Sequence, residues 1–224
     1  MQRAHVISTL SSAIPLLLLW TAPVHGQADD RPPVTVQPGA PGEPTRVLGS
    51  DEVEALDRPT YTEADVRFIR GMIRHHAQAL DMVELLRERT ESEDLRRLAL
   101  RIEISQEDEI ALMEQWLRER NEPVPERGAG SPPDAPPASV VPGMLTRAQM
   151  DELAGTRGEA FDRLFLEMMI QHHQGALRMV ERLFRSPGGG QVSSVNHIAG
   201  EVQADQAMEI ERMRQMLDDR RNDR

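Results

Sequence analysis

The chain has 224 residues, a formal net charge of −11 and no cysteine. The acidic balance argues against a nucleic-acid-binding protein, which normally presents a basic face. The absence of cysteine excludes disulfides, thiolate zinc sites and iron–sulfur clusters, so a metal site would have to use histidine, methionine, carboxylates or amides. Only 3% of the residues are aromatic, which leaves a core of aliphatic side chains and methionine and favours helices.

Residues 1–26 have the pattern of a secretory signal peptide. A short polar start precedes the apolar stretch "AIPLLLLW", and Val24 and Gly26 occupy the small-residue positions before a cleavage site. The apolar stretch is too short to span a bilayer. We therefore expect a periplasmic or secreted protein that has no stable membrane insertion after cleavage. An uncleaved N-terminal anchor is the alternative.

Two stretches rich in proline and glycine divide the rest of the chain. Residues 27–58 lack an apolar period and are predicted to be a disordered leader, and residues 121–142 are predicted to be a linker. The segments between and after them, 59–120 and 143–220, are each predicted to be a helical hairpin. Together they would form one bundle domain over 59–220.

Helix start and stop signals place the helices within these two segments. Thr62 and Asp65 form a predicted capping box for a first helix, which runs to about Arg89. After the break at "TESED", a second helix is expected over about 94–120. The second half begins with a short helix at "TRAQMDELAG", and two long helices over about 158–185 and 192–219 follow, separated by "SPGGG".

The two halves repeat one another. Residues 65–83 match residues 162–180, with ten of nineteen positions identical. The second helices match more weakly, through residues that include Gln106 with Gln206 and Glu109 with Glu209. An internal duplication of a helical hairpin predicts an all-α fold in which two hairpins form a four-helix bundle.

A histidine doublet recurs in the same apolar setting in both halves, as "MIRHH" and "MMIQHH". The helical spacing places both doublets on the core-facing side. The second helices carry Gln and Glu within an apolar seam, where unpaired polar groups are costly. Antiparallel folding of each hairpin puts its doublet level with its Gln and Glu. Histidines, carboxylates and methionines are therefore predicted to converge near the middle of the bundle.

This combination of side chains suits a metal ion. Imidazole and thioether ligands together favour copper, and the soft methionine sulfur selects Cu(I), although other transition metals stay open. The candidate ligands are His75, His76, His172, His173, Met72, Met169, Glu109, Glu209, Met82 and Met179. The alternatives are core packing for the methionines, buried histidines satisfied by carboxylate or backbone, and glutamates that orient imidazoles without binding metal.

The doubled motif resembles that of the DUF305 family, which is named for its unknown function. The family pattern has Phe, three residues, then Met-Ile-x-His-His-x-x-Ala-x-x-Met. It is matched from Phe68 to Met82 and again from Phe165 to Met179. The resemblance covers about residues 60–218 and implies ferritin-like helical hairpins. Some members are exported copper-binding proteins linked to copper resistance, which implies a similar role here. The chain lacks the dense additional Met and His runs expected of a high-capacity copper store.

Three functions remain open on the sequence. The first is an exported copper-binding protein without turnover, such as a buffer, chaperone or tolerance factor. The second is a ferritin-like metalloenzyme that oxidises metal, although neither hairpin has the Glu-x-x-His of a di-iron carboxylate centre. The third is a structural or partner-binding bundle without metal. The expected partners are a metal ion and, beyond it, a second copy of the chain or another copper-handling protein.

Overall fold

The helices of the protein follow the predicted order. The computed structural model describes residues 35–38, 42, 44–49, 60–127 and 141–222. It divides the chain into two units, residues 1–56 and 57–224. The described helices of the second unit are α2 (Glu63–Arg87), α3 (Glu93–Glu119), α4 (Arg147–Gly155), α5 (Gly158–Arg185) and α6 (Ser193–Asn222). The predicted signal peptide and residues 128–140 of the predicted linker lie outside the described residues.

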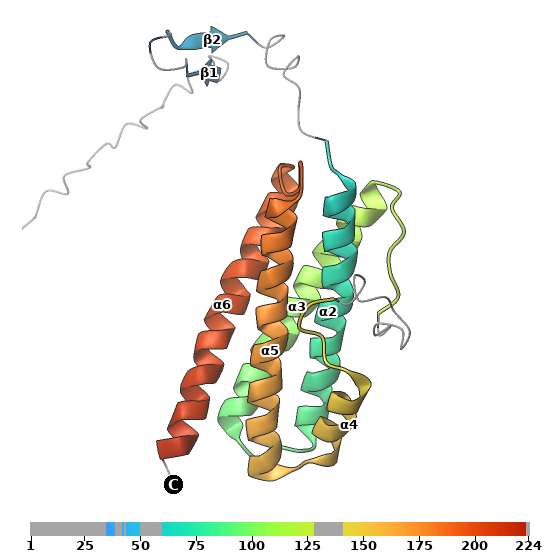
Figure 1. Cartoon of the computed structure of the whole chain (residues 1–224), viewed down its shortest axis with the longest axis vertical. Helices are drawn as coiled ribbons and strands as arrows, with labels where there is room; N and C mark the ends of the chain where they lie inside the picture. The colour runs from blue at the N-terminus through green and yellow to red at the C-terminus, as the bar shows by residue number, and fades with distance from the viewer. Residues whose placement is uncertain (1–34, 39–41, 43, 50–59, 128–140, 223–224) are drawn as a thin grey trace, which may run out of the picture. The chain divides into compact units, whose positions relative to one another are not determined.

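The four long helices form two antiparallel hairpins, α2–α3 and α5–α6, which pack together chiefly through α2 and α5 (Figure 1). The short α4 lies against α5, and α3 and α6 touch only sparingly. The predicted all-α fold is confirmed. Among the described residues, no helix combines the length and hydrophobicity that a membrane span requires.

The first unit contains a small β-hairpin where the sequence predicted a leader without regular structure. Strand β1 (Thr35–Gln37) pairs antiparallel with β2 (Arg46–Leu48), and Val36 lies opposite Val47. The β-branched side chains on both strands favour this pairing. Gly42, with φ of 96°, supplies the left-handed conformation that the connection uses. The proline and glycine content of this segment therefore does not prevent local pairing of two short strands.

The start of α2 is a complete capping box. The Thr62 hydroxyl accepts the backbone N–H of Asp65, and the Asp65 carboxylate accepts the backbone N–H of Thr62 at 2.7 Å. The second oxygen of the fully buried Asp65 accepts the N–H of Gly190 at 2.7 Å. This one carboxylate therefore joins the turn between α5 and α6 to the first turn of α2.

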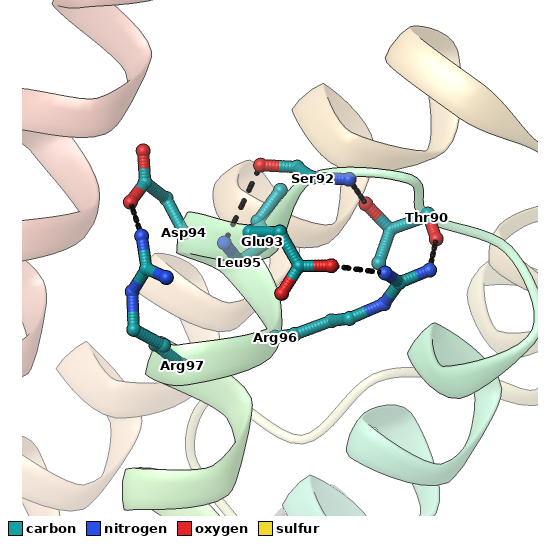
Figure 2. A network of polar contacts seen from close by, with 7 residues as sticks. All are labelled: Thr90, Ser92, Glu93, Asp94, Leu95, Arg96 and Arg97. Carbon is teal, nitrogen blue, oxygen red and sulfur yellow. Dashed lines mark hydrogen bonds and ion pairs between the residues drawn. The ribbon is translucent and has the colours of Figure 1, made fainter.

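The turn between α2 and α3 is also held by polar contacts (Figure 2). The Ser92 hydroxyl accepts the N–H of Leu95 and caps α3, while the Ser92 N–H donates to the Thr90 hydroxyl at 3.0 Å. Arg96 donates to the carbonyl of Thr90 at 2.7 Å and to Glu93 at 2.6 Å. The predicted break is thus a short turn that brings α3 back along α2.

The interior of the bundle consists of two apolar clusters with a polar layer between them. On α2, residues 66–73 belong to one cluster and residues 79–86 to the other. The same division recurs on α3, α5 and α6. The layer between the clusters contains these buried polar side chains: His75, His76, Gln78, Gln106, Glu109, His172, His173, Gln206 and Glu209.

A strap, which we define as Val141–Leu145, crosses α5 at the point where the predicted linker (121–142) meets the second predicted hairpin (143–220). Gly143 has φ of 83°, and a side chain built on Gly175 of α5 would place its Cβ 2.1 Å from the Pro142 carbonyl oxygen. The side-chain amide of Gln78 on α2 holds the strap through two hydrogen bonds to the backbone of Leu145. It donates to the carbonyl at 2.9 Å and accepts the N–H at 2.7 Å. Backbone therefore touches backbone where the strap crosses α5, and only glycine permits this approach.

We expect Gly175→Ala to lower the free energy of unfolding by roughly 1–3 kcal/mol, because the new methyl group overlaps backbone atoms that cannot move independently. Urea unfolding followed by circular dichroism measures the change. Gly200→Ala on α6 is the matched control, since a Cβ there meets nothing within 4 Å. This control should be neutral or stabilising by up to about 1 kcal/mol. Equal stability of the two variants would refute the close approach of the strap.

Candidate metal centre

The polar layer is centred on four histidines without solvent exposure. His75 and His76 lie on α2, His172 and His173 lie on α5, and each has a relative exposure of 0%. The sequence placed all four on the core-facing side, and the structure confirms their burial. Because α2 and α5 pack directly against each other, both doublets enter the same layer.

His75 and His172 form the centre of this layer. Their ring centroids are 3.7 Å apart and the rings are inclined by 34°. Burial lowers the pKa of both rings well below 6.5, and the neighbouring histidines lower it further. Two imidazolium ions could not occupy this position together. The pair is therefore neutral at physiological pH, which is the state in which imidazole binds metal.

The hydrogen bonds of the pair define which ring nitrogens are free. Nε2 of His75 lies 3.1 Å from the carbonyl oxygen of Pro142, and a carbonyl only accepts, so this nitrogen carries the proton. Nδ1 of the neutral His75 ring then holds a lone pair and has no hydrogen-bond partner. In His172, both ring nitrogens lack a partner. The strap therefore orients one ring and leaves its second nitrogen available as a ligand.

The outer histidines repeat this arrangement with carboxylates. Nε2 of His76 donates to Glu109 Oε2 at 2.6 Å, and Nε2 of His173 donates to Glu209 Oε2 at 2.7 Å. Nδ1 of both rings is buried and without a partner. A carboxylate behind the ligating imidazole is a common arrangement in metal sites, where it fixes the tautomer and the orientation of the ring.

Two glutamines in the same layer are also unsatisfied. Gln106 and Gln206 are fully buried, and neither the amide nitrogen nor the amide oxygen of either residue has a hydrogen-bond partner. A buried polar group without a partner costs about 1–3 kcal/mol. The layer thus contains both lone pairs and donors that a further polar or ionic group would satisfy.

The candidate methionines flank the histidines on both sides. Met72 and Met179 belong to the apolar cluster on one side of the polar layer, and Met169 and Met82 belong to the cluster on the other side. None of the four is more than 7% exposed. Because α2 and α5 run antiparallel, each side receives the first methionine of one motif and the last methionine of the other.

The described residues contain no group of three or more histidine, aspartate and glutamate side chains that is already arranged to hold a metal ion. Glu109 and Glu209 act in this structure as hydrogen-bond acceptors of imidazoles. The fit to a metal therefore rests on the donor chemistry. Imidazole nitrogens with free lone pairs, together with the thioethers of the adjoining clusters, are the ligand types that Cu(I) prefers.

Further acidic side chains lie near the carboxylates of Glu109 and Glu209. Burial raises the pKa of Asp205 on α6, and the nearby charges of Glu109, Glu209 and Glu201 raise it further. Glu109 also lines the groove between α3 and α6. Two carboxylates on this side of the bundle accept hydrogen bonds from His76 and His173, and Arg101 lines the same groove.

The sequence alone does not indicate the groups that orient the central ring. Pro142 lies in the predicted linker, and Gln78, which holds the strap, lies beside Arg74 and Asp81 on the helix surface, so its polar character does not predict burial. Nothing in the sequence indicated that the carbonyl of Pro142 would reach His75, since that contact joins segments 67 residues apart.

Comparisons with known proteins agree with this fold. A DUF305 fragment from Deinococcus radiodurans is 32% identical with a TM-score of 0.61, covering 71% of this chain and 98% of that chain. A DUF305 protein from Streptomyces coelicolor, described as secreted, is 30% identical with a TM-score of 0.60, covering 70% and 93%. CopM in its Cu(I)-bound form is 28% identical with a TM-score of 0.54, covering 71% and 98%. Structures of CopM with Cu(II) and with silver also match.

Among curated proteins, none matches the chain. The profile of the domain of unknown function DUF305 matches residues 65–217, which is more than half of the chain and includes both histidine doublets. The chain belongs to the DUF305 family.

Proposed function

We propose that this protein is an exported copper-binding protein that holds Cu(I) in the polar layer of its bundle. His75 and His172 supply the central imidazoles, and His76 and His173 supply further nitrogen ligands. Met72, Met169, Met82 and Met179 supply thioethers, and Glu109 and Glu209 orient the outer imidazoles. The protein buffers or transfers the ion without turnover.

The observation that carries this proposal is the set of free lone pairs inside the bundle. Three of the buried histidines have Nε2 engaged by an acceptor and Nδ1 without a partner. In His172 neither nitrogen has a hydrogen-bond partner, so the nitrogen that does not carry the proton offers a lone pair. A purely structural histidine would be expected to satisfy its buried nitrogens. Copper binding is supported further by the similarity to CopM, whose structures contain Cu(I) and Cu(II). Export is supported by the N-terminal signal pattern and by the relative described as secreted.

The chemistry of the layer favours Cu(I) over harder ions. A doubly charged ion is costly to bury unless negative ligands compensate its charge. Neutral imidazoles and thioethers supply no such negative charge. The two buried carboxylates are already hydrogen-bonded to histidines. A singly charged soft ion therefore costs less to bury here than Zn²⁺ or Fe²⁺.

Replacement of both central rings in His75→Gln/His172→Gln should weaken Cu(I) binding at least roughly tenfold, because the central nitrogen ligands are lost. Competition with a chromophoric Cu(I) chelator under anaerobic conditions measures the affinity for the chain from Gln27 onward. The exposed His197→Gln is the control and should bind as the unmodified chain does. Unchanged affinity of the double variant would exclude the site. Oxygen consumption on addition of Fe(II) would instead favour the alternative function, a ferritin-like enzyme that oxidises metal.

The thioethers should determine the preference for Cu(I). Met72→Leu/Met169→Leu conserves side-chain volume but removes both sulfurs, so the affinity for Cu(I) should fall at least roughly tenfold while any affinity for Zn(II) stays the same. Met208→Leu is the matched control, because Met208 is 64% exposed and lies outside the polar layer. If Cu(I) affinity survives in the double variant, these two methionines only pack in the core.

The lowered pKa of the central histidines makes the metal-free protein less stable in acid. Below about pH 6.5 the unfolded chain binds protons at these two rings while the folded chain does not, so stability falls as the pH decreases. The loss should begin near pH 6.5 and become steeper below it, with a limiting slope of at most about 1.4 kcal/mol per pH unit for each ring. Urea unfolding between about pH 7.5 and pH 5.5 measures the slope. The slope should be smaller in His75→Gln/His172→Gln and unchanged in His197→Gln, and equal slopes in all three proteins would contradict the neutral pair.

A further inference from the structure

A groove with exposed apolar side chains runs between α3 and α6, and Glu109 is among the residues that line it. Its volume is about 710 Å³. Leu100 and Ile104 line it with exposures of 55% and 56%, Leu112 lines it with 39%, and Met208 lies at its edge with 64%. Eight large apolar side chains are exposed in the described part of the chain, and four of them gather here. Single exposed apolar residues need no explanation, but a contiguous patch indicates an interaction surface.

The pattern of α3 explains why this surface exists. The face toward the core carries residues such as Ile102, Glu109 and Met113. The outer face repeats at intervals of four residues, through Leu100, Ile104, Asp108 and Leu112, and its apolar members are not needed by the core. Because α3 and α6 touch only sparingly, the bundle does not close over this face. The helix is therefore apolar on two faces, of which the bundle covers one.

The charges on the outer face are arranged symmetrically. Arg101 and Asp108 both line the groove, and neither has an ion-pair partner among the residues that the structure describes. They lie at equal distances along α3 from the midpoint between Ile104 and Ser105, one on each side. Arg97 continues the basic end and is held by Asp94 (Figure 2), while Glu201 and Asp205 of α6 add to the acidic side of the groove.

We propose that this face binds a second copy of the same chain, with the two α3 helices antiparallel about a twofold axis near Ile104 and Ser105. In this register Arg101 of each copy lies next to Asp108 of the other, and Ile104 packs against its counterpart on the axis. A twofold interface requires a surface that is complementary to itself. A groove with apolar side chains in the middle, one free base on one side and one free acid on the other meets this requirement.

The distribution of charge selects the second copy over an unrelated partner. A basic partner would be repelled by Arg101, and an acidic partner would be repelled by Asp108 and Asp205. With a net charge of −11, two copies repel each other at long range, so the apolar contact and the paired charges must form together. Glu109 lines this groove and accepts the hydrogen bond of His76, whereas the contact proposed for the interface is made by the exposed apolar side chains together with Arg101 and Asp108.

Sedimentation velocity of the chain from Gln27 onward, over a range of concentrations, tests the proposal. We expect a reversible monomer–dimer equilibrium. Ile104→Glu should raise the dissociation constant at least roughly tenfold, because it places two carboxylates together on the axis. The matched control is Val47→Glu in the β-hairpin, where an equally exposed apolar residue lies outside the groove, and it should leave the equilibrium unchanged. A purely monomeric chain at its highest soluble concentration would overturn the proposal.

Charge exchange tests the register and does not rely on disruption alone. Arg101→Glu and Asp108→Arg should each weaken the dimer, and the variant that carries both changes should recover most of the affinity, because the pairs re-form with reversed sign. Circular dichroism checks that each variant keeps its helix content. Failure of the double variant to recover would overturn the antiparallel register. His75→Gln/His172→Gln should still dimerise, so loss of the proposed copper site and loss of the proposed dimer give separate results.

Discussion

The contact on which the rest of this bundle depends is the pair of neutral imidazoles formed by His75 and His172. The two rings lie 3.7 Å apart in the interior, and burial keeps both uncharged. They belong to a polar layer that divides the apolar core into two clusters. A layer of this kind is expensive for a bundle of this size, because several of its buried atoms lack partners. Apolar side chains at these positions would make the bundle more stable if packing were their only role. Binding of an ion gives a physical reason for the polar layer.

The surroundings of the pair support the histidine rings from two sides. The strap from Val141 to Leu145 is held by Gln78 and by the close approach of Gly143 to Gly175, and it delivers the carbonyl that orients His75. On the opposite side of the layer, Glu109 and Glu209 orient His76 and His173 and lie near further carboxylates. Ligands are thus fixed in place by groups that do not themselves need to bind the metal.

Duplication explains both the symmetry of the layer and its departures from symmetry. The two hairpins supply matching His–Glu pairs and matching methionines, and their antiparallel packing distributes these over both sides of the layer. Among the described residues, His75 has the carbonyl of Pro142 as its acceptor, whereas the ring nitrogens of His172 have no hydrogen-bond partner. The second helices also diverged on their outer faces: Arg101 of α3 corresponds to Glu201 of α6, and Asp108 corresponds to Met208. A repeat that keeps its core face and changes its outer face can acquire new contacts without altering its interior.

The sequence by itself determined the helices, the duplication and the burial of both histidine doublets. These features follow from periodicity and from capping residues such as Thr62, which act over a few residues and are visible in the chain. It also predicted that Glu109 and Glu209 would lie level with the doublets, because a hairpin with a short turn has only one register. Only the tertiary structure decided that the rings of His75 and His172 lie 3.7 Å apart, that a carbonyl from the predicted linker orients one of them, and that the predicted leader contains a β-hairpin. The reason is physical: periodicity specifies which side of a helix is buried, whereas the partner that each buried atom finds depends on packing between segments far apart in the chain.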